Sequence, residues 1–296
     1  MPRRGFPSAC DAAAVASKCR LYAILARDAP RAVIFRRGPS ASVLLALWHT
    51  DTDQIEEGQW LKGRLYERRA DLSPDGTKLL YFAAQHRRKT TPTWTAISTP
   101  PWLTAHVLWP KGDSYGGGGL WESNKSIVLN HPYGDLSLDP ATSLPKKLSV
   151  REMGLFGGGG EDFPLLHMRL ERDGWRLVSR SKSEPRFEYA RPRPTDGDLE
   201  LRMRIVSVNE TGGDWYVVEH RVVRVGDEEV VLDLGRTEWA DWDRSGDLLF
   251  ARDGVLFRIR RNPLTLTRAR EVVDLRDREF VARPAPPRAR IWKMRT

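Results

Sequence analysis

The stretch ADLSPDGTKLLYFAA, residues 70–84, reads as a strand, a tight turn and a second strand. Its Pro-Asp-Gly segment, residues 74–76, has the residues that tight turns favour, and residues 79–82 form an apolar run rich in strand formers. Near the other end of the chain, ADWDRSGDLLFARDG, residues 240–254, repeats this pattern almost position for position. A unit that occurs twice indicates a repeat architecture, which has to be examined before any single motif.

The same frame recurs at five places in the chain. It consists of an apolar residue four positions before a turn residue and two apolar or small residues three and four positions after it. The turn residues, separated by 47, 48, 50 and 72 residues, are Ala29, Gly76, Asn124, Gly174 and Gly246. A period near 48 residues with about four short strands is typical of a β-propeller blade, which buries both of its faces only by stacking on its neighbours.

The unit at residues 70–84 resembles the repeat of the TolB-type propellers, a WD-like class in which Phe or Trp precedes Ser-Pro-Asp-Gly and an apolar strand. The resemblance is good in this unit and fair at residues 240–254, where Arg244 and Ser245 replace the Pro and the Asp. In the other three units it is degenerate. The resemblance implies a fold and no particular activity, because propellers of this class bind proteins, gate enzymes or carry sugar chemistry.

We therefore predict one all-β domain, a β-propeller of five blades with four antiparallel strands each, over residues 19–280. The fourth blade is predicted to be enlarged and to include the Pro-rich segment 189–198. Six blades, with the 72-residue interval split in two, is the alternative. Residues 1–18 are predicted to form a flexible N-terminal tail and residues 281–296 a Pro- and Arg-rich C-terminal tail that is also mobile, with Ile291 and Trp292 as candidates to dock and help close the ring.

Alternation of the strands assigns the loops to the two faces of such a propeller. Strand A precedes each turn and strand B follows it. The A–B turns then lie on one face, here the A–B face, and the B–C and D–A connections lie on the opposite one, here the D–A face. Predicted C strands include residues 42–49, 93–98 and 255–260, and predicted outer D strands include residues 104–109 and 271–275.

Residues 112–116, Gly-Asp-Ser-Tyr-Gly, match the pattern of a serine nucleophile elbow. Such an elbow needs a buried strand before the serine and a helix after it, on an α/β scaffold. Here glycines follow the serine and no helical period appears downstream. We predict that Ser114 is not a nucleophile and that the tetraglycine runs 116–119 and 157–160 are crossings between blades, where glycine allows close approach of the backbone.

The other titratable residues give weaker signals. The six histidines show no i, i+2 or i, i+4 pairing and the two cysteines no CxxC spacing, so we predict no metal site. The Gly-rich loops lack the ending of a phosphate-binding loop, and we expect no cofactor. Asp71 and Asp241 occur where a strand-end Asp bonds backbone amides in a turn. Five inner-strand carboxylates are nonetheless candidates to face a channel: Glu67, Asp71, Glu171, Asp241 and Asp243.

The net charge of +9 comes mostly from arginines scattered among the strands. This excess is either a footprint of nucleic-acid binding or a compositional preference for arginine. No apolar run approaches the length of a membrane span, and the N-terminal residues lack the apolar stretch of a secretory signal. We expect a cytoplasmic protein that does not contact a membrane.

The leading hypothesis is a monomeric, non-enzymatic scaffold that binds a protein or peptide partner on the D–A face. The alternatives are a sugar-active hydrolase that uses channel carboxylates and a protein that binds nucleic acid through its arginines. Lys62 and Lys111 occupy equivalent places in adjacent blades and are predicted to hold an anionic group between them. The predicted binding residues are Arg36, Arg37, Lys62, Arg64, Lys111, Asp113, Tyr115, Glu161, Asp162 and Glu238.

Overall fold

The computed structural model describes residues 19–38, 42–131, 136–154, 162–183, 186–208 and 216–292. Within them, strands form five sheets that follow one another along the chain, and each sheet is built from consecutive strands. The predicted all-β class is therefore confirmed. The N-terminal tail, Glu161 and the second tetraglycine run lie outside the described residues.

The first and fifth sheets have the predicted form of a blade, with four consecutive strands that are antiparallel throughout. The third strand of both sheets and the fourth strand of the fifth sheet fall where the sequence predicted them. The first sheet contains β1 (Arg20–Leu25), β2 (Arg31–Arg37), β3 (Ser42–His49) and β4 (Gln54–Lys62). The fifth contains β18 (Trp239–Trp242), β19 (Leu248–Arg252), β20 (Val255–Ile259) and β21 (Arg270–Asp274), with the 3-10 helix η3 (Leu266–Arg268) before β21.

The second sheet holds the unit with the best resemblance, and its inner strand is interrupted. β5 (Arg64–Leu65) and β6 (Asp71–Leu72) both pair with β7 (Leu79–Ala84), and the 3-10 helix η1 (Glu67–Arg69) lies between them. β8 (Thr93–Ser98) and β9 (Ala105–Pro110) complete the sheet at the predicted C and D positions. Gly76 has a φ of 69° in the turn, a conformation that glycine adopts without strain.

The third sheet departs from the predicted four antiparallel strands. It contains β10 (Gly119–Ser123), β11 (Ser126–Leu129) and β12 (Ser149–Glu152), and β12 runs parallel to β11, with Ser126 opposite Ser149. A parallel neighbouring strand requires a long connection, because the chain has to return to the end at which the previous strand began. Within the described residues, the prediction of a four-stranded antiparallel blade is wrong for this sheet.

The fourth sheet is enlarged, as predicted, but the expected inner strand around Leu170 is a helix. α1 (Leu165–Arg172) buries Leu165, Leu166, Arg169 and Leu170, which share one face of a 3.6-residue period. The prediction that no helix occurs in this part of the chain is wrong. The rest of the fourth sheet contains β13 (Arg176–Arg180), β14 (Phe187–Pro192), β15 (Leu199–Val208), β16 (Tyr216–Arg224) and β17 (Val230–Arg236).

No helix in the described ranges is long and apolar enough to cross a membrane.

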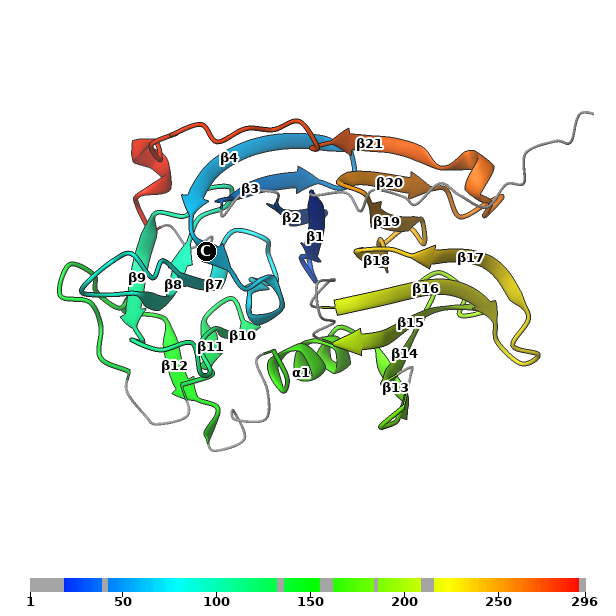
Figure 1. Ribbon diagram of the computed structural model, residues 1–296, viewed down its shortest axis with the longest axis horizontal. Helices are drawn as coiled ribbons and strands as arrows, with labels where there is room; N and C mark the ends of the chain where they lie inside the picture. Colours follow the sequence, from blue (N-terminus) through cyan, green and yellow to red (C-terminus); the bar gives the residue numbers. More distant parts are fainter. Residues whose placement is uncertain are drawn as a thin grey trace, which may run out of the picture.

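The sheets are arranged around a common central region, which makes the fold propeller-like (Figure 1). β1, β18 and α1 lie toward the centre, and β4, β9 and β21 lie toward the outside. β1 contacts β6 and β19, β10 contacts β6 and β7, α1 contacts β10 and β13, and β15 contacts β18. Each sheet thus lies against the next one, with α1 between the third and fourth, and the first sheet also lies against the fifth.

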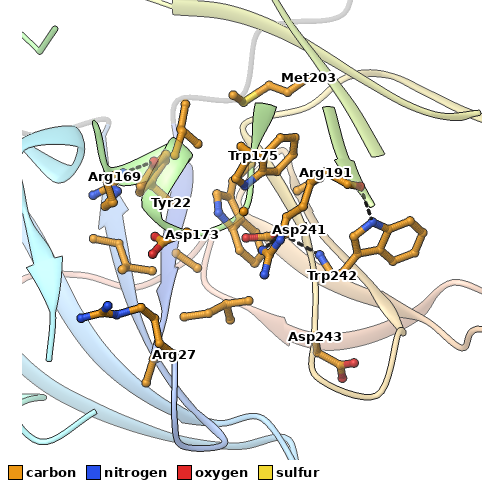
Figure 2. A pocket seen from close by; sticks show the side chains of 18 of the residues that line it. Tyr22, Arg27, Arg169, Asp173, Trp175, Arg191, Met203, Asp241, Trp242 and Asp243 are labelled. Carbon is orange, nitrogen blue, oxygen red and sulfur yellow. Dashed lines mark hydrogen bonds and ion pairs between the residues drawn. The ribbon is translucent and has the colours of Figure 1, made fainter. Parts of the chain in front are cut away.

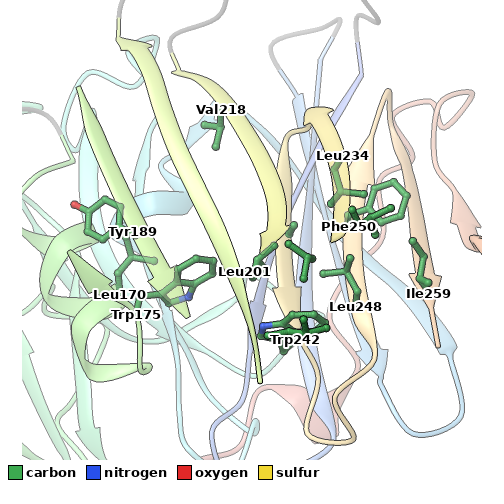
Figure 3. Packing of buried hydrophobic residues seen from close by; sticks show 14 of the residues in the cluster. Leu170, Trp175, Tyr189, Leu201, Val218, Leu234, Trp242, Leu248, Phe250 and Ile259 are labelled. Atoms are coloured by element: carbon green, nitrogen blue, oxygen red, sulfur yellow. The ribbon is translucent and has the colours of Figure 1, made fainter. Parts of the chain in front are cut away.

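Buried apolar side chains fill the spaces between neighbouring sheets. Figure 3 shows Leu170 and Trp175 packed in one cluster with Trp242, Leu248 and Phe250, so that α1 and the fourth and fifth sheets share a core. Four further tryptophans lie between neighbouring sheets in the same way. Trp48 and Trp239 lie in a cluster between the first and fifth sheets, and Trp109 and Trp121 lie in one between the second and third.

The C-terminal residues return to the first two sheets. The guanidinium of Arg283 donates to the carbonyl of Glu57 in β4. Trp292 packs edge-on against His106 of β9, and the Lys78 ammonium lies 5.2 Å from the centroid of the indole ring. The 3-10 helix η4 (Pro287–Ala289) precedes this contact. Within the described residues, the predicted tail is therefore docked through Trp292.

Candidate functional site

A cavity of about 540 Å³, here the central cavity, is lined by residues of β1, α1, β15, β16 and β18. Its walls come from the first, fourth and fifth sheets, since α1 takes the place of an inner strand in the fourth. Its volume falls within the range of about 300–1,000 Å³ that ligand sites occupy. The charged residues that line it are Arg27, Arg31, Arg68, Arg169, Arg172, Arg191, Arg244, Asp173, Glu238, Asp241 and Asp243.

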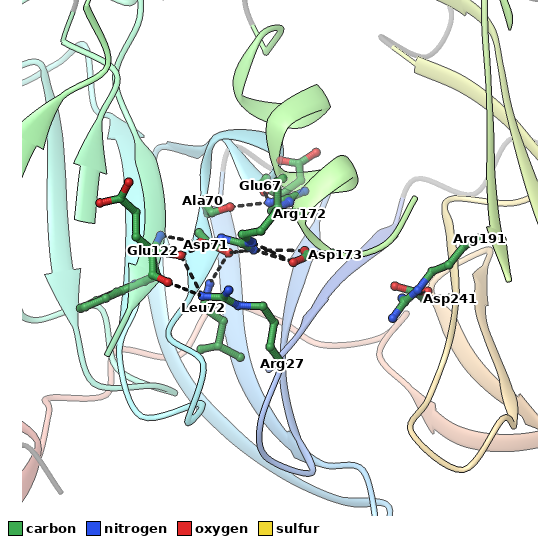
Figure 4. A network of polar contacts seen from close by, with 12 residues as sticks. Arg27, Glu67, Ala70, Asp71, Leu72, Glu122, Arg172, Asp173, Arg191 and Asp241 are labelled. Atoms are coloured by element: carbon green, nitrogen blue, oxygen red, sulfur yellow. Dashed lines mark hydrogen bonds and ion pairs between the residues drawn. The ribbon is translucent and has the colours of Figure 1, made fainter. Parts of the chain in front are cut away.

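One wall of the cavity is held by an ion-pair network around Arg172 at the end of α1 (Figure 4). Arg172 Nη2 donates to Asp71 Oδ1 at 2.9 Å, and the same guanidinium contacts the carboxylate of Asp173 at 2.8 Å. Asp71 Oδ2 also accepts the backbone N–H of Trp121 at 2.6 Å, which joins the second and third sheets. Burial raises the pKa of Asp173, although the positive charge of Arg172 opposes that rise.

The opposite wall carries a second arginine–aspartate pair, between Arg191 of β14 and Asp241 of β18 (Figure 2). Asp241 Oδ1 accepts the backbone N–H of Trp242 at 2.8 Å, and the indole Nε1 of Trp242 donates to the carbonyl of Arg191 at 3.1 Å. Burial raises the pKa of Asp241, and its partner arginine opposes that rise. Figure 2 places this group across the cavity from Tyr22 and Arg169.

Asp71 and Asp241 stand one position before the apolar residue of their repeat units, and the structure gives both the same role. Each accepts the N–H of the next residue and pairs with an arginine. The prediction that these two aspartates bond backbone amides is confirmed. The other three candidate carboxylates also have basic partners: Glu67 pairs with Arg37 and Arg68, Asp243 with Arg258, and Glu171 with His167.

The end of the cavity near the A–B turns has a different character. Arg31, at the start of β2, is half-buried, and Arg244, in the turn between β18 and β19, is exposed. In the part of the chain that the structure describes, neither guanidinium has a hydrogen-bond or ion-pair partner. Arg27, in the neighbouring turn, donates to the carbonyl of Trp121 at 2.9 Å. This end, here the cavity mouth, therefore carries two guanidinium groups that form no ion pair with a described carboxylate.

Three of the predicted D–A face residues are engaged within the fold. Arg36 is 2% exposed and donates to the carbonyls of Leu275 and Arg276, which links β2 to the end of the fifth sheet. Arg37 pairs with Glu67, and the buried Asp162 accepts from the guanidinium of Arg69 at 3.0 Å. These side chains have structural partners that a docking partner would have to displace.

Among the other predicted residues, Lys62, Asp113 and Tyr115 are exposed, whereas Arg64 and Lys111 are half-buried. The Lys62 ammonium lies 4.4 Å from the ring centroid of Phe280, and the Arg64 guanidinium lies over the ring of Tyr66. The ammonium of Lys111 lies 2.9 Å from Asp113 Oδ1, so an external anion would have to compete with this ion pair. Tyr115 has 51% of its surface exposed.

The segment that holds Ser114 does not form a nucleophile elbow. The carbonyls of Ser114 and Gly116 accept from the guanidinium of Arg69, and the chain continues into strand β10 instead of a helix. Ser114 thus lies in an irregular segment that leads into a strand. The predicted close approach of the backbone at the first tetraglycine run is confirmed, since a Cβ on Gly118 would lie 2.0 Å from the carbonyl oxygen of Arg69. The described residues contain no group of three His, Cys, Asp or Glu side chains that could hold a metal ion.

Glu238 lines the cavity and binds the backbone rather than another side chain. Its carboxylate accepts the N–H of Leu21 at 2.7 Å and that of Gly254 at 3.3 Å. These bonds tie the start of β18 to β1 and to the turn between β19 and β20. Burial raises the pKa of Glu238 from 4.5 to about 7, and the two backbone N–H groups only partly offset this rise.

This raised pKa predicts a pH dependence of stability. The folded state holds the Glu238 proton more tightly than the unfolded chain, so the stabilisation is complete below pH 4.5 and is lost as pH rises through about 7. The unfolding free energy of the wild type should therefore fall as pH rises from about 5 to about 8. We expect this fall to be smaller by roughly 2 kcal/mol in Glu238→Gln, which has no carboxyl group to titrate. Urea unfolding at several pH values measures this, with Glu229→Gln as an exposed control. Equal pH slopes for wild type and Glu238→Gln would contradict the assignment.

The repeat frame did not identify the charged residues of the cavity mouth. Arg244 occupies the position that Pro74 occupies in the second unit, so this substitution within the motif was a visible signal. Arg172 and Asp173 were missed because their segment was assigned to a strand. Arg31 follows a degenerate turn and carries no local signal of its own.

No family model and no curated protein matches the chain. Among solved structures, hydrazine synthase of Kuenenia stuttgartiensis is similar over 86% of this chain and 80% of that chain, with a TM-score of 0.30 and 9% identity. Dihydro-heme d1 dehydrogenase NirN in complex with DHE is similar over 83% of this chain and 65% of that chain, with a TM-score of 0.24 and 10% identity. At these TM-scores neither similarity bears on the function of this chain.

Proposed function

We propose that the protein is a non-enzymatic binding module on a five-bladed, TolB-type propeller, whose central cavity receives part of a protein or peptide partner. One observation carries the proposal. The cavity combines carboxylates that are already bound to arginines or backbone amides with two arginines at its mouth, Arg31 and Arg244, that lack a described partner. Such a site is equipped to bind an anionic ligand rather than to transfer protons.

Five blades are favoured over six by the match between repeat units and sheets. Each of the five units falls in, or directly before, one sheet, and the long interval before Gly246 is occupied by one five-stranded sheet. The contact of β1 with β19 brings the first sheet against the last, as closure of a ring requires. Propeller blades gain their stability from such neighbours.

The cavity mouth is favoured over the D–A face as the docking site. On the D–A face, internal ion pairs already involve Arg37, Lys111 and Asp162. A partner would gain little from pairs that are already made, because each new contact there requires breaking an existing one. At the mouth, a partner's charge meets unpaired guanidinium groups.

Site-specific cross-linking tests this function. A photoreactive benzoylphenylalanine placed at Ala29, in the turn that lines the mouth, is expected to capture a polypeptide from an extract of the source cells. The same residue at Lys125, in the exposed turn between β10 and β11, serves as the control. Capture at position 125 but not at position 29, or turnover of a substrate that depends on cavity carboxylates, would contradict the proposal.

A second candidate function, sugar hydrolysis, is favoured by one observation. Asp173 and Asp241 line the same cavity, and burial raises the pKa of both, as general acids require. A panel of chromogenic glycosides tests it directly. Activity that disappears in both Asp173→Asn and Asp241→Asn would establish the hydrolase in place of the binding module.

A further inference from the structure

We infer that the central cavity binds an acidic peptide segment that also carries apolar side chains, with its carboxylates held at the mouth by Arg31 and Arg244. This inference rests on the proposed function of the cavity and names the chemistry of the ligand. Three properties of the site support it: a rigid mouth, unneutralised positive charge and an apolar wall.

The backbone of the mouth is fixed in place by its own hydrogen bonds. In the turn of Arg244, Asp243 Oδ1 accepts the N–H groups of Ser245 at 2.8 Å and Asp247 at 3.0 Å. In the turn before Arg31, the N–H of Asp28 donates to the carbonyl of Pro74 at 2.8 Å, which anchors it to the second sheet. A rigid mouth lowers the entropic cost of binding, because only the arginine side chains have to be ordered.

The charge at the mouth is not cancelled from within the cavity. Deeper arginines are paired: Arg172 with Asp71 and Asp173, and Arg191 with Asp241. Asp243, the carboxylate nearest to Arg244 in sequence, is itself bound by Arg258. Guanidinium groups form strong, bidentate hydrogen bonds with carboxylates, so the unpaired arginines favour an anionic group at this end.

The rest of the lining favours a peptide over a nucleic acid. Ile24, Leu170, Trp175 and Met203 give the cavity an apolar wall, against which aliphatic or aromatic side chains of a ligand gain burial. A peptide can place carboxylates at the arginines and apolar side chains against the wall.

Fluorescence anisotropy with labelled peptides of three compositions tests the inference. The probes are twelve-residue peptides that alternate Leu with Glu, with Gln or with Lys, and a twelve-nucleotide single-stranded DNA is the fourth probe. We expect the Glu–Leu peptide to bind most tightly of the four probes. Its Kd should rise about tenfold or more in the double variant Arg31→Glu/Arg244→Glu. Its affinity should fall with added salt, since charge pairs at an open mouth are screened.

A matched double variant controls for the change in net charge. Arg87 and Arg260 are exposed, do not line the cavity and have no partner among the described side chains. Arg87→Glu/Arg260→Glu is therefore expected to change the Kd less than about twofold, within what a distant exposed charge contributes. If Arg31→Glu/Arg244→Glu fails to fold in urea titrations, Arg31→Gln/Arg244→Gln takes its place.

Several outcomes would overturn the inference. They are equal affinity for the Glu and Gln peptides, equal losses in the two double variants, or absence of binding to the Glu–Leu peptide. Tighter binding of the oligonucleotide with the same dependence on Arg31 and Arg244 would replace the peptide by a nucleic acid. If the Glu–Leu peptide does not bind but position 29 still cross-links to a polypeptide, the proposed ligand chemistry is wrong and the binding function stands. If position 29 does not cross-link either, the binding function is wrong as well.

Discussion

Asp71→Ala is expected to lower the free energy of unfolding by about 3–5 kcal/mol, the cost of removing one partner from a buried ion pair. The side chain of Asp71 is fully buried, and its two oxygens accept from the Arg172 guanidinium and from the N–H groups of Leu72 and Trp121. Alanine leaves the arginine without its main anion and the Trp121 N–H without an acceptor. One substitution therefore weakens the junction of the second sheet, the third sheet and α1.

Urea unfolding followed by tryptophan fluorescence measures this loss, and two further variants separate its causes. Asp71→Asn keeps an oxygen for Trp121 but removes the charge, so we expect a smaller loss of about 2–3 kcal/mol. Asp113→Ala breaks an exposed pair with Lys111 and is expected to cost about 1 kcal/mol or less. Similar losses for Asp71→Ala and Asp113→Ala would show that the buried network does not hold these elements together.

Gly118→Ala is expected to be nearly as damaging, for a reason that involves no charge. Gly118 has a φ of 80°, and a Cβ there would lie 2.0 Å from the carbonyl oxygen of Arg69. Arg69 cannot retreat easily, because its guanidinium is bound to Asp162 and to the carbonyls of Ser114 and Gly116. Left-handed strain and overpacking together predict a loss of about 2–5 kcal/mol.

Gly112→Ala is the matched control for this prediction. Gly112 has a similar φ of 88°, but a Cβ there would meet nothing within 4 Å. Its loss should be limited to about 1–2 kcal/mol of conformational strain. The difference between the two variants isolates the steric contact, and equal thermal stabilities would contradict the close packing of the glycine crossing. If Gly118→Ala does not fold, its far-UV circular dichroism against that of Gly112→Ala gives the same comparison.

The repeat frame located the hairpins of most sheets because the residues that define the frame are the ones that a tight hairpin needs. A turn residue that tolerates a left-handed backbone, flanked by apolar residues at fixed offsets, specifies a tight hairpin whose side chains face both neighbours. Gly76 and Gly246 both have positive φ and occupy hairpin turns as predicted. Asn124 shows that glycine is not required, since β10 and β11 flank it in the same way.

The frame failed where a short helix satisfied the same apolar spacing. Leu170 lies four positions before Gly174, as the frame demands, but it is also one helical turn from Leu166. Two turns of helix give too few residues for a clear period of 3.6, so the sequence could not separate the two readings. The parallel β12 was missed for another reason, because the direction of a strand depends on a connection that carries no local pattern.

The predicted site residues were chosen by loop face and charge, and that choice could not anticipate internal pairing. Arg37 and Glu67 are 30 positions apart, and Arg69 and Asp162 are 93 apart, yet each pair is in direct contact. Conversely, Arg31 and Arg244 line one cavity although they come from the first and fifth sheets. Such juxtapositions depend on how the sheets are arranged around the centre, which the repeat period alone does not specify.

Hydrogen exchange in the presence and absence of the Glu–Leu peptide tests the binding cavity most directly, because it reports on both faces at once. The amides of the mouth turns, residues 26–31 and 243–247, are expected to exchange more slowly when the peptide is bound. Residues 62–66 and 111–116, on the D–A face, should exchange at unchanged rates. Protection confined to the D–A face segments, with none in the mouth turns, would contradict the central cavity as the binding site.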